Sequence, residues 1–65
     1  MDEIAVIIRI PPEQAEALAQ FLKRTGFDDC RRLASRYDGG EEAEEMWAAI
    51  QKLQQALKEV GFNPR

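Results

Sequence analysis

The 65-residue sequence lacks histidine altogether and contains a single cysteine, Cys30. Histidine is the commonest metal ligand and the usual general base near neutral pH, so its absence removes the simplest routes to a metal centre or to acid–base catalysis. No apolar run approaches the 18 or more residues that a membrane helix requires. Phosphate-loop, dinucleotide, zinc and EF-hand patterns are also missing. We therefore expect a non-enzymatic chain with no cofactor, no metal and no membrane segment.

The small size of the chain predicts self-association. Residues 1–65 form one small domain, and a domain of this size buries only about 60% of the surface that its unfolded chain exposes. Such domains usually gain stability from disulfides, a metal or oligomerisation. One cysteine allows no internal disulfide, and the missing histidines disfavour a metal. Oligomerisation remains, and a homodimer is the simplest form.

The charge balance disfavours nucleic acid as a partner. The net charge is −3, and the excess lies in the second half, because residues 1–37 hold six acids and six bases whereas residues 38–65 hold six acids and three bases. An acidic domain binds a phosphate backbone poorly. The first residues are acidic, unlike a signal peptide. Together with one free cysteine, this predicts a location in the cytoplasm of a bacterial host cell.

Residues 3–10 are β-branched and apolar, and Pro11-Pro12 interrupts them, which predicts a strand. On a strand, Ala5, Ile7 and Arg9 lie on one face and a second apolar set lies on the other. A lone strand leaves its backbone donors and acceptors unpaired. The sequence therefore predicts that this strand pairs across a homodimer, with the second set as the dimer strand: Ile4, Val6, Ile8 and Ile10.

Helical spacing of apolar residues then predicts helices over about 12–25, 28–37 and 41–60. Gly26 and Gly61 follow the first and third of them, where left-handed glycine commonly ends a helix. Cys30 falls on the apolar face of the second helix, so we interpret it as a small buried side chain rather than a nucleophile. The predicted fold class is α+β, with one N-terminal strand followed by three helices.

Charged side chains near the middle of the chain are candidates for binding a partner. Arginines occupy the outer face of the second helix, and glutamates open the third. They could contact a partner of opposite charge, or they could form solvated faces that balance each other and complement the helix dipole. The candidate partner-binding residues are Arg9, Arg31, Arg32, Arg36, Glu41, Glu42 and Glu45.

The stretch Val6-Ile7-Ile8-Arg9-Ile10-Pro11-Pro12-Glu13-Gln14, with the helix to Thr25-Gly26 and the helix after it, resembles the start of ribbon-helix-helix repressors and antitoxins. This resemblance implies an antiparallel strand pair that enters the DNA major groove, with Ala5, Ile7 and Arg9 at the base-reading positions. The side chains of Ala5 and Ile7 form no hydrogen bonds to base edges. The resemblance therefore favours the paired-strand architecture over the reading of DNA bases.

A second resemblance covers nearly the whole chain. The blocks Ala17-Leu18-Ala19-Gln20-Phe21-Leu22-Lys23-Arg24-Thr25-Gly26-Phe27 and Leu57-Lys58-Glu59-Val60-Gly61-Phe62-Asn63-Pro64-Arg65 look like a family of short uncharacterised proteins of temperate, Mu-like phages and prophages. The resemblance implies a small phage-encoded protein that inhibits or diverts a host protein, as anti-CRISPR proteins do. A DNA-binding regulator or antitoxin is the alternative that the first resemblance implies.

Overall fold

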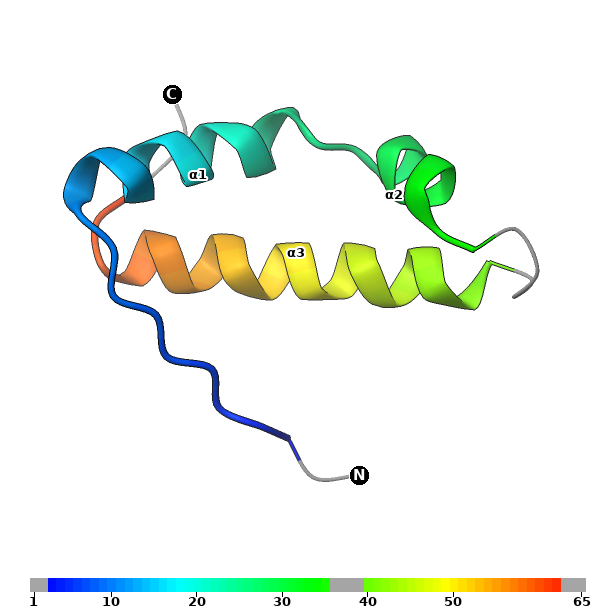
Figure 1. The fold of residues 1–65 in the computed structure, drawn as a ribbon, viewed down its shortest axis with the longest axis horizontal. Coiled ribbons are helices and arrows are strands. Elements are labelled where there is room, and N and C mark those ends of the chain that lie inside the picture. The colour runs from blue at the N-terminus through cyan, green and yellow to red at the C-terminus, as the bar shows by residue number, and fades with distance from the viewer. Residues whose placement is uncertain (1–2, 36–39, 63–65) are drawn as a thin grey trace.

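The computed structural model describes residues 3–35 and 40–62, and these contain three helices (Figure 1). The helices are α1 (Pro12–Arg24), α2 (Phe27–Leu33) and α3 (Glu41–Glu59). α1 and α2 follow each other in one layer, and both pack on the long α3. Residues 3–10 leave this helical body as an extended segment, which we call the arm.

The prediction of a strand over residues 3–10 is wrong, and with it the α+β class and the strand paired across a homodimer. The arm is extended, but no strand is present anywhere in the described ranges. Of the predicted dimer residues, Ile4, Val6 and Ile8 are 86%, 76% and 55% exposed, and only Ile10 packs against the core. β-branched residues favour extended backbone, but a ladder needs a second strand, and the other regular segments described are helical.

α1 begins and ends where local chemistry directs it. Pro12 occupies the first helical position, where a missing N–H costs nothing, and the Pro11 carbonyl accepts hydrogen bonds from the N–H groups of Gln14 and Ala15. At the other end Thr25 turns extended, with φ −88° and ψ 123°. Its hydroxyl donates to the Phe21 carbonyl at 2.7 Å, which satisfies one of the carbonyls that a helix end leaves unpaired.

α2 is shorter than the predicted helix over 28–37. It starts at Phe27 and ends at Leu33, because Ala34 adopts an extended conformation with φ −78° and ψ 163°. Gly26 is not a left-handed stop for α1, since its φ is −109°; it is the N-cap of α2. Arg36, predicted to lie on this helix, falls outside the described residues.

The end of α3 confirms the predicted glycine stop. Gly61 has φ +98°, the left-handed region that glycine adopts without strain. The Phe62 N–H donates to the Leu57 carbonyl at 2.9 Å, and the Gly61 N–H donates to the Lys58 carbonyl at 3.0 Å. This pair of bonds is the Schellman motif, and it returns Phe62 to pack near Leu57.

The core is small and is made largely of short side chains. Ala15, Ala19 and Leu22 of α1 and Leu57 of α3 are buried together, and further apolar residues pack around them: Ile10, Leu18, Ile50, Leu53 and Phe62. Close-packed alanines let the two helices approach, but they contribute little apolar area.

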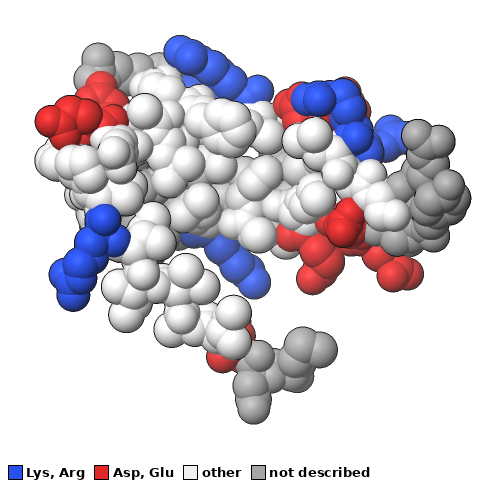
Figure 2. All heavy atoms as spheres, in the orientation of Figure 1, with Lys and Arg blue, Asp and Glu red and all other residues white. Residues whose placement is uncertain are grey.

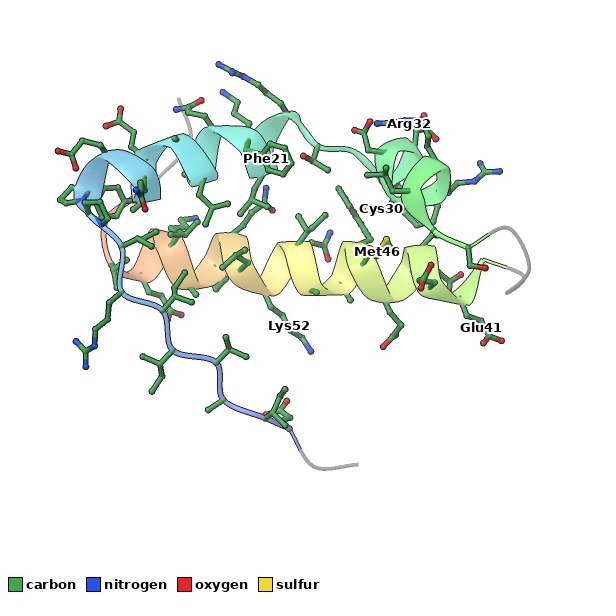
Figure 3. The ribbon with its side chains drawn as sticks, viewed as in Figure 1. Phe21, Cys30, Arg32, Glu41, Met46 and Lys52 are labelled. Carbon is green, nitrogen blue, oxygen red and sulfur yellow. The ribbon has the colours of Figure 1, made fainter. Side chains whose placement is uncertain are left out.

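A second contact joins α2 to α3. Cys30 and Ala43 are buried, and Cys30 points from α2 toward α3 (Figure 3). The Phe27 and Trp47 rings meet edge to face, with 6.3 Å between centroids. The interpretation of Cys30 as a buried side chain is confirmed.

Candidate protein-interaction site

Exposed apolar side chains, rather than convergent polar ones, distinguish the surface of this chain. Within residues 3–35 and 40–62, no three acidic or cysteine side chains are grouped so that they could hold a metal ion. None of the helices described has the length and apolar character to cross a membrane. By contrast, large apolar side chains are exposed along the arm, near the end of α1, at both ends of α2 and just after α3: Ile4, Val6, Ile7, Ile8, Phe21, Phe27, Leu33 and Val60.

One hollow lies where α1 gives way to α2, and we call it the α1–α2 notch. It has a volume of about 400 Å³ and is lined by Ala17, Phe21, Arg24, Thr25, Asp29, Arg32 and Leu33. Phe21 and Leu33 are 63% and 66% exposed, so each keeps most of its apolar surface in water. The notch is therefore lined by two exposed apolar side chains together with two arginines.

The residues of the notch come from the face of α1 that does not touch α3. Ala17, Phe21 and Arg24 are spaced i, i+4 and i+7, so they form a stripe along the helix beside the one that the core uses. The apolar spacing that predicted the helix over about 12–25 did not reveal this second stripe. The spacing of Phe21 from Arg24 was the available signal, but the break between α1 and α2 that opens the notch was not visible in the pattern.

Charged groups hold the wall of the notch in a fixed arrangement. The Gly26 N–H donates to Asp29 Oδ2 at 2.8 Å, and Arg32 Nη2 donates to Asp29 Oδ1 at 3.1 Å. The Gly26 hydrogen bond, followed by that from Arg32, holds the pKa of Asp29 below its ordinary value of 3.8. The guanidinium of Arg32 is thereby directed toward Asp29, and Figure 2 shows basic side chains on the outer side of α1 and α2.

The depressed pKa of Asp29 makes a testable prediction about stability and pH. A folded-state pKa below the unfolded value means that ionised Asp29 stabilises the fold above pH 3.8 and loses this effect as the pH falls through the folded-state pKa. Asp29→Asn keeps an acceptor oxygen for the Gly26 N–H but loses the carboxylate charge, so it is expected to melt a few degrees below the wild type at pH 7. Thermal melts from pH 7 to pH 2.5 measure the difference, which should shrink below pH 3.8. A difference that is constant across the range would contradict this role.

The second hollow lies between the arm and the end of α3, and we call it the arm groove. Its volume is about 560 Å³, and it is lined by Val6, Ile7, Ile8, Arg9, Ile10, Ala15, Leu53, Ala56, Leu57, Val60 and Phe62. Along α3, Leu53, Ala56, Leu57 and Val60 are spaced i, i+3, i+4 and i+7, so one helical face forms the floor. Arg9 is the one charged residue among those lining it.

The structure separates the predicted partner-binding residues instead of gathering them. Arg9 lies on the arm, whereas Arg31 and Arg32 are exposed on α2 and only Arg32 lines the notch. Arg36 falls outside the described residues. The predicted residues Glu41, Glu42 and Glu45 are exposed on the first turns of α3, and Figure 2 shows acidic side chains at that end. Glu42 already accepts a hydrogen bond from the Ser35 N–H, so it links α3 to the segment after α2.

Comparison with known proteins identifies a family and no characterised relative. A model described as "Family of unknown function (DUF7706)" matches residues 1–65. No curated protein and no solved structure matches the chain. The function is therefore argued from the two hollows and the side chains that line them.

Proposed function

We propose that this chain, which belongs to the DUF7706 family of unknown function, is a non-catalytic protein-binding protein that contacts its target through the α1–α2 notch. The observation that carries this proposal is Phe21, an aromatic side chain 63% exposed in a notch whose rim holds Arg24 and Arg32. Aromatic and arginine side chains dominate the binding energy of protein interfaces. The notch combines the two kinds of side chain, with Phe21 from α1 and Arg32 from α2, and both helices pack on α3 (Figure 3).

The chemistry of the notch indicates the kind of surface that it binds. Phe21 and Leu33 offer apolar area, and Arg32, held by Asp29, is already oriented before a partner arrives. Holding a side chain in place before binding reduces the entropy lost on association. Arg24 forms no ion pair with another described residue, so its guanidinium is available to an incoming carboxylate. The proposed target surface therefore presents an apolar side chain flanked by Asp or Glu.

We place this activity in the cytoplasm of a bacterial host, as the work of a phage or prophage protein that inhibits or diverts a host protein. The support is the likeness of the blocks Ala17–Phe27 and Leu57–Arg65 to short proteins of temperate, Mu-like phages. Inhibition by occupying a surface requires no catalytic group, and a chain of 65 residues with an aromatic-centred notch is suited to it. DNA binding is not proposed, since the strand pair on which that interpretation depended is not among the described elements.

The test is an affinity purification that compares variants of the notch. The tagged wild-type chain, Phe21→Ala with Leu33→Ala, and the control Lys52→Ala on exposed α3 are incubated with nuclease-treated bacterial extract. A stoichiometric protein retained by the wild type and the control, and lost with the notch variant, is expected. With the purified target, Phe21→Ala should weaken binding by on the order of 30-fold, a typical hot-spot loss.

Several outcomes would overturn the proposal. They are recovery of no stoichiometric protein, equal retention of the target by the notch variant and the wild type, or a gel shift showing specific DNA binding by the wild type. Circular dichroism of each variant establishes that the helices are intact, which separates loss of binding from loss of folding.

A further inference from the structure

The arm groove is an apolar cleft that the described chain leaves open. Val6 and Ile7 on the arm side and Val60 on the α3 side are all well exposed, although they line the same hollow of about 560 Å³. Filling the space between two exposed apolar surfaces with an apolar group removes both surfaces from water and lowers the free energy. The groove thus has apolar residues on both sides, from the arm and from α3, and the space between them is open.

The arm is held away from its own α3 by the residues at its base. Ile10 packs against the core, which fixes the point of departure. Pro11 has φ −67° and ψ 158°, and the rings of Pro11 and Pro12 lock φ at both positions. A residue before a proline is restricted to extended backbone, so Ile10 and Pro11 have little freedom to turn. The base of the arm therefore resists a fold-back that would close the groove from within the same molecule.

The chain exposes more surface than a compact chain of its mass, and the surplus is larger than one partner's share of an ordinary interface. The accessible surface is 5706 Å², whereas a compact folded chain of this mass exposes about 4,200 Å². The excess is roughly 1,500 Å². A stable complex of ordinary size covers about 800 Å² on each partner. The radius of gyration, 13.1 Å against about 10.7 Å for a compact domain of this length, shows the same surplus of extension.

We propose that the occupant is the arm of a second copy of the chain, so that two molecules exchange residues 3–10 and each arm lies in the groove of the other. The arm is of the right chemistry, since four of its side chains are exposed apolar groups: Ile4, Val6, Ile7 and Ile8. The exchange is symmetric, because each molecule supplies one arm and one groove, and symmetric pairing closes at two copies.

This contact differs from pairing of two strands. The incoming arm packs its side chains on the α3 floor formed by Leu53, Leu57 and Val60, and the outer edge of its backbone keeps its hydrogen bonds to water. The exchange also uses a surface separate from the α1–α2 notch. It therefore does not depend on the proposed function, and its failure leaves that proposal standing.

Sedimentation velocity of the full chain at concentrations from about 1 to 100 μM tests the exchange, because a dimer with a Kd in the micromolar range dissociates within that interval. The wild type is expected to sediment as a dimer at the upper end of the range. Ile7→Asp on the arm and Val60→Asp on the groove should each raise the dissociation constant on the order of 30-fold, since each places an unpaired charge against apolar surface. The matched control, Phe21→Asp in the notch, should dimerise like the wild type. A monomer at 100 μM, or a dimer insensitive to both groove variants, would overturn the proposal.

Cysteine pairing then identifies which segments meet. Molecules carrying Ile7→Cys are mixed with differently tagged molecules carrying Val60→Cys and treated with glutathione disulfide, which accepts the two electrons and leaves as reduced glutathione. Cys30 is kept in both, because it is buried. A disulfide that joins Ile7→Cys of one molecule to Val60→Cys of the other is expected, because the incoming arm packs on the α3 floor. Its absence at concentrations where the chain is dimeric would refute the exchange. So would disulfides confined to single molecules of the Ile7→Cys/Val60→Cys double variant at those concentrations.

Discussion

Replacing Leu22 with alanine is expected to lower the free energy of unfolding by about 3 kcal/mol, the cost of truncating a leucine in a close-packed core. Leu22 is 3% exposed and packs with Ala15, Ala19 and Leu57 at the contact between α1 and α3. A domain of this length has a total stability of only roughly 3–10 kcal/mol. One side chain therefore carries a large share of what keeps the chain folded.

The composition of the core explains why the effect is this large. Among the described residues, the buried set consists of three alanines, one cysteine and two leucines. Truncating an alanine removes almost no apolar area, so the leucines carry most of the burial in this set. The cavity left by Leu22 also adds to the cost wherever the surrounding residues do not close it.

Leu33→Ala is the matched control, because it makes the same chemical change at a side chain that is 66% exposed. It should change the free energy of unfolding by no more than about 0.5 kcal/mol, as surface substitutions usually do. Urea unfolding followed by circular dichroism measures both variants against the wild type. Equal destabilisation by the two substitutions would mean that the core does not lie between α1 and α3.

The helices were predictable because their signals are local. Pro12 at the start of α1, the glutamates at the start of α3 and Gly61 after α3 each act through the backbone within one turn. Such features need no knowledge of the rest of the molecule. Among the apolar residues of α3 and its C-cap, Ala43 and Leu57 are buried whereas Val60 is 69% exposed.

What could not be predicted depends on contacts between distant segments. Residues 3–10 carry a strand-like composition, but a strand is a relation between two segments, and the described chain offers no second one. Gly26 follows a helix, as a left-handed stop would, yet it caps the next helix because Asp29 accepts its N–H. The notch likewise depends on how α2 sits on α3, which brings Leu33 into one hollow with Phe21 although no periodicity links the two.

The thiol of Cys30 is expected to react with a disulfide reagent at least about 100-fold more slowly in the native chain than in the unfolded chain. Cys30 is 3% exposed and lies under α2, so reagent reaches it only when α2 leaves α3. Reaction through such an opening is slowed by the opening equilibrium, and about 100-fold corresponds to a modest local stability. The neighbouring Arg31 and Arg32 are exposed on α2, and their positive charge does not give the reagent access to the buried thiol.

A variant with Leu33→Cys provides an internal standard, because its new thiol replaces a side chain 66% exposed on the same helix. Its reaction trace should show one fast phase from residue 33 and one slow phase from Cys30. Equal rates for the two thiols would mean that Cys30 is accessible and that α2 does not pack on α3. Absorbance of the released thiolate at pH 8 follows both phases.

The urea dependence of the slow phase distinguishes a local opening from global unfolding. α2 has seven residues and reaches α3 through Cys30, Ala43 and the Phe27–Trp47 ring pair, none of which belongs to the α1–α3 core cluster. Release of α2 alone therefore exposes little surface, and the slope of the rate with urea scales with the surface exposed. We expect a shallow slope at low urea and the full slope only near the unfolding midpoint. A full slope throughout would show that α2 and the α1–α3 core open together, because the ring pair and the buried Cys30 then couple the two halves of the molecule.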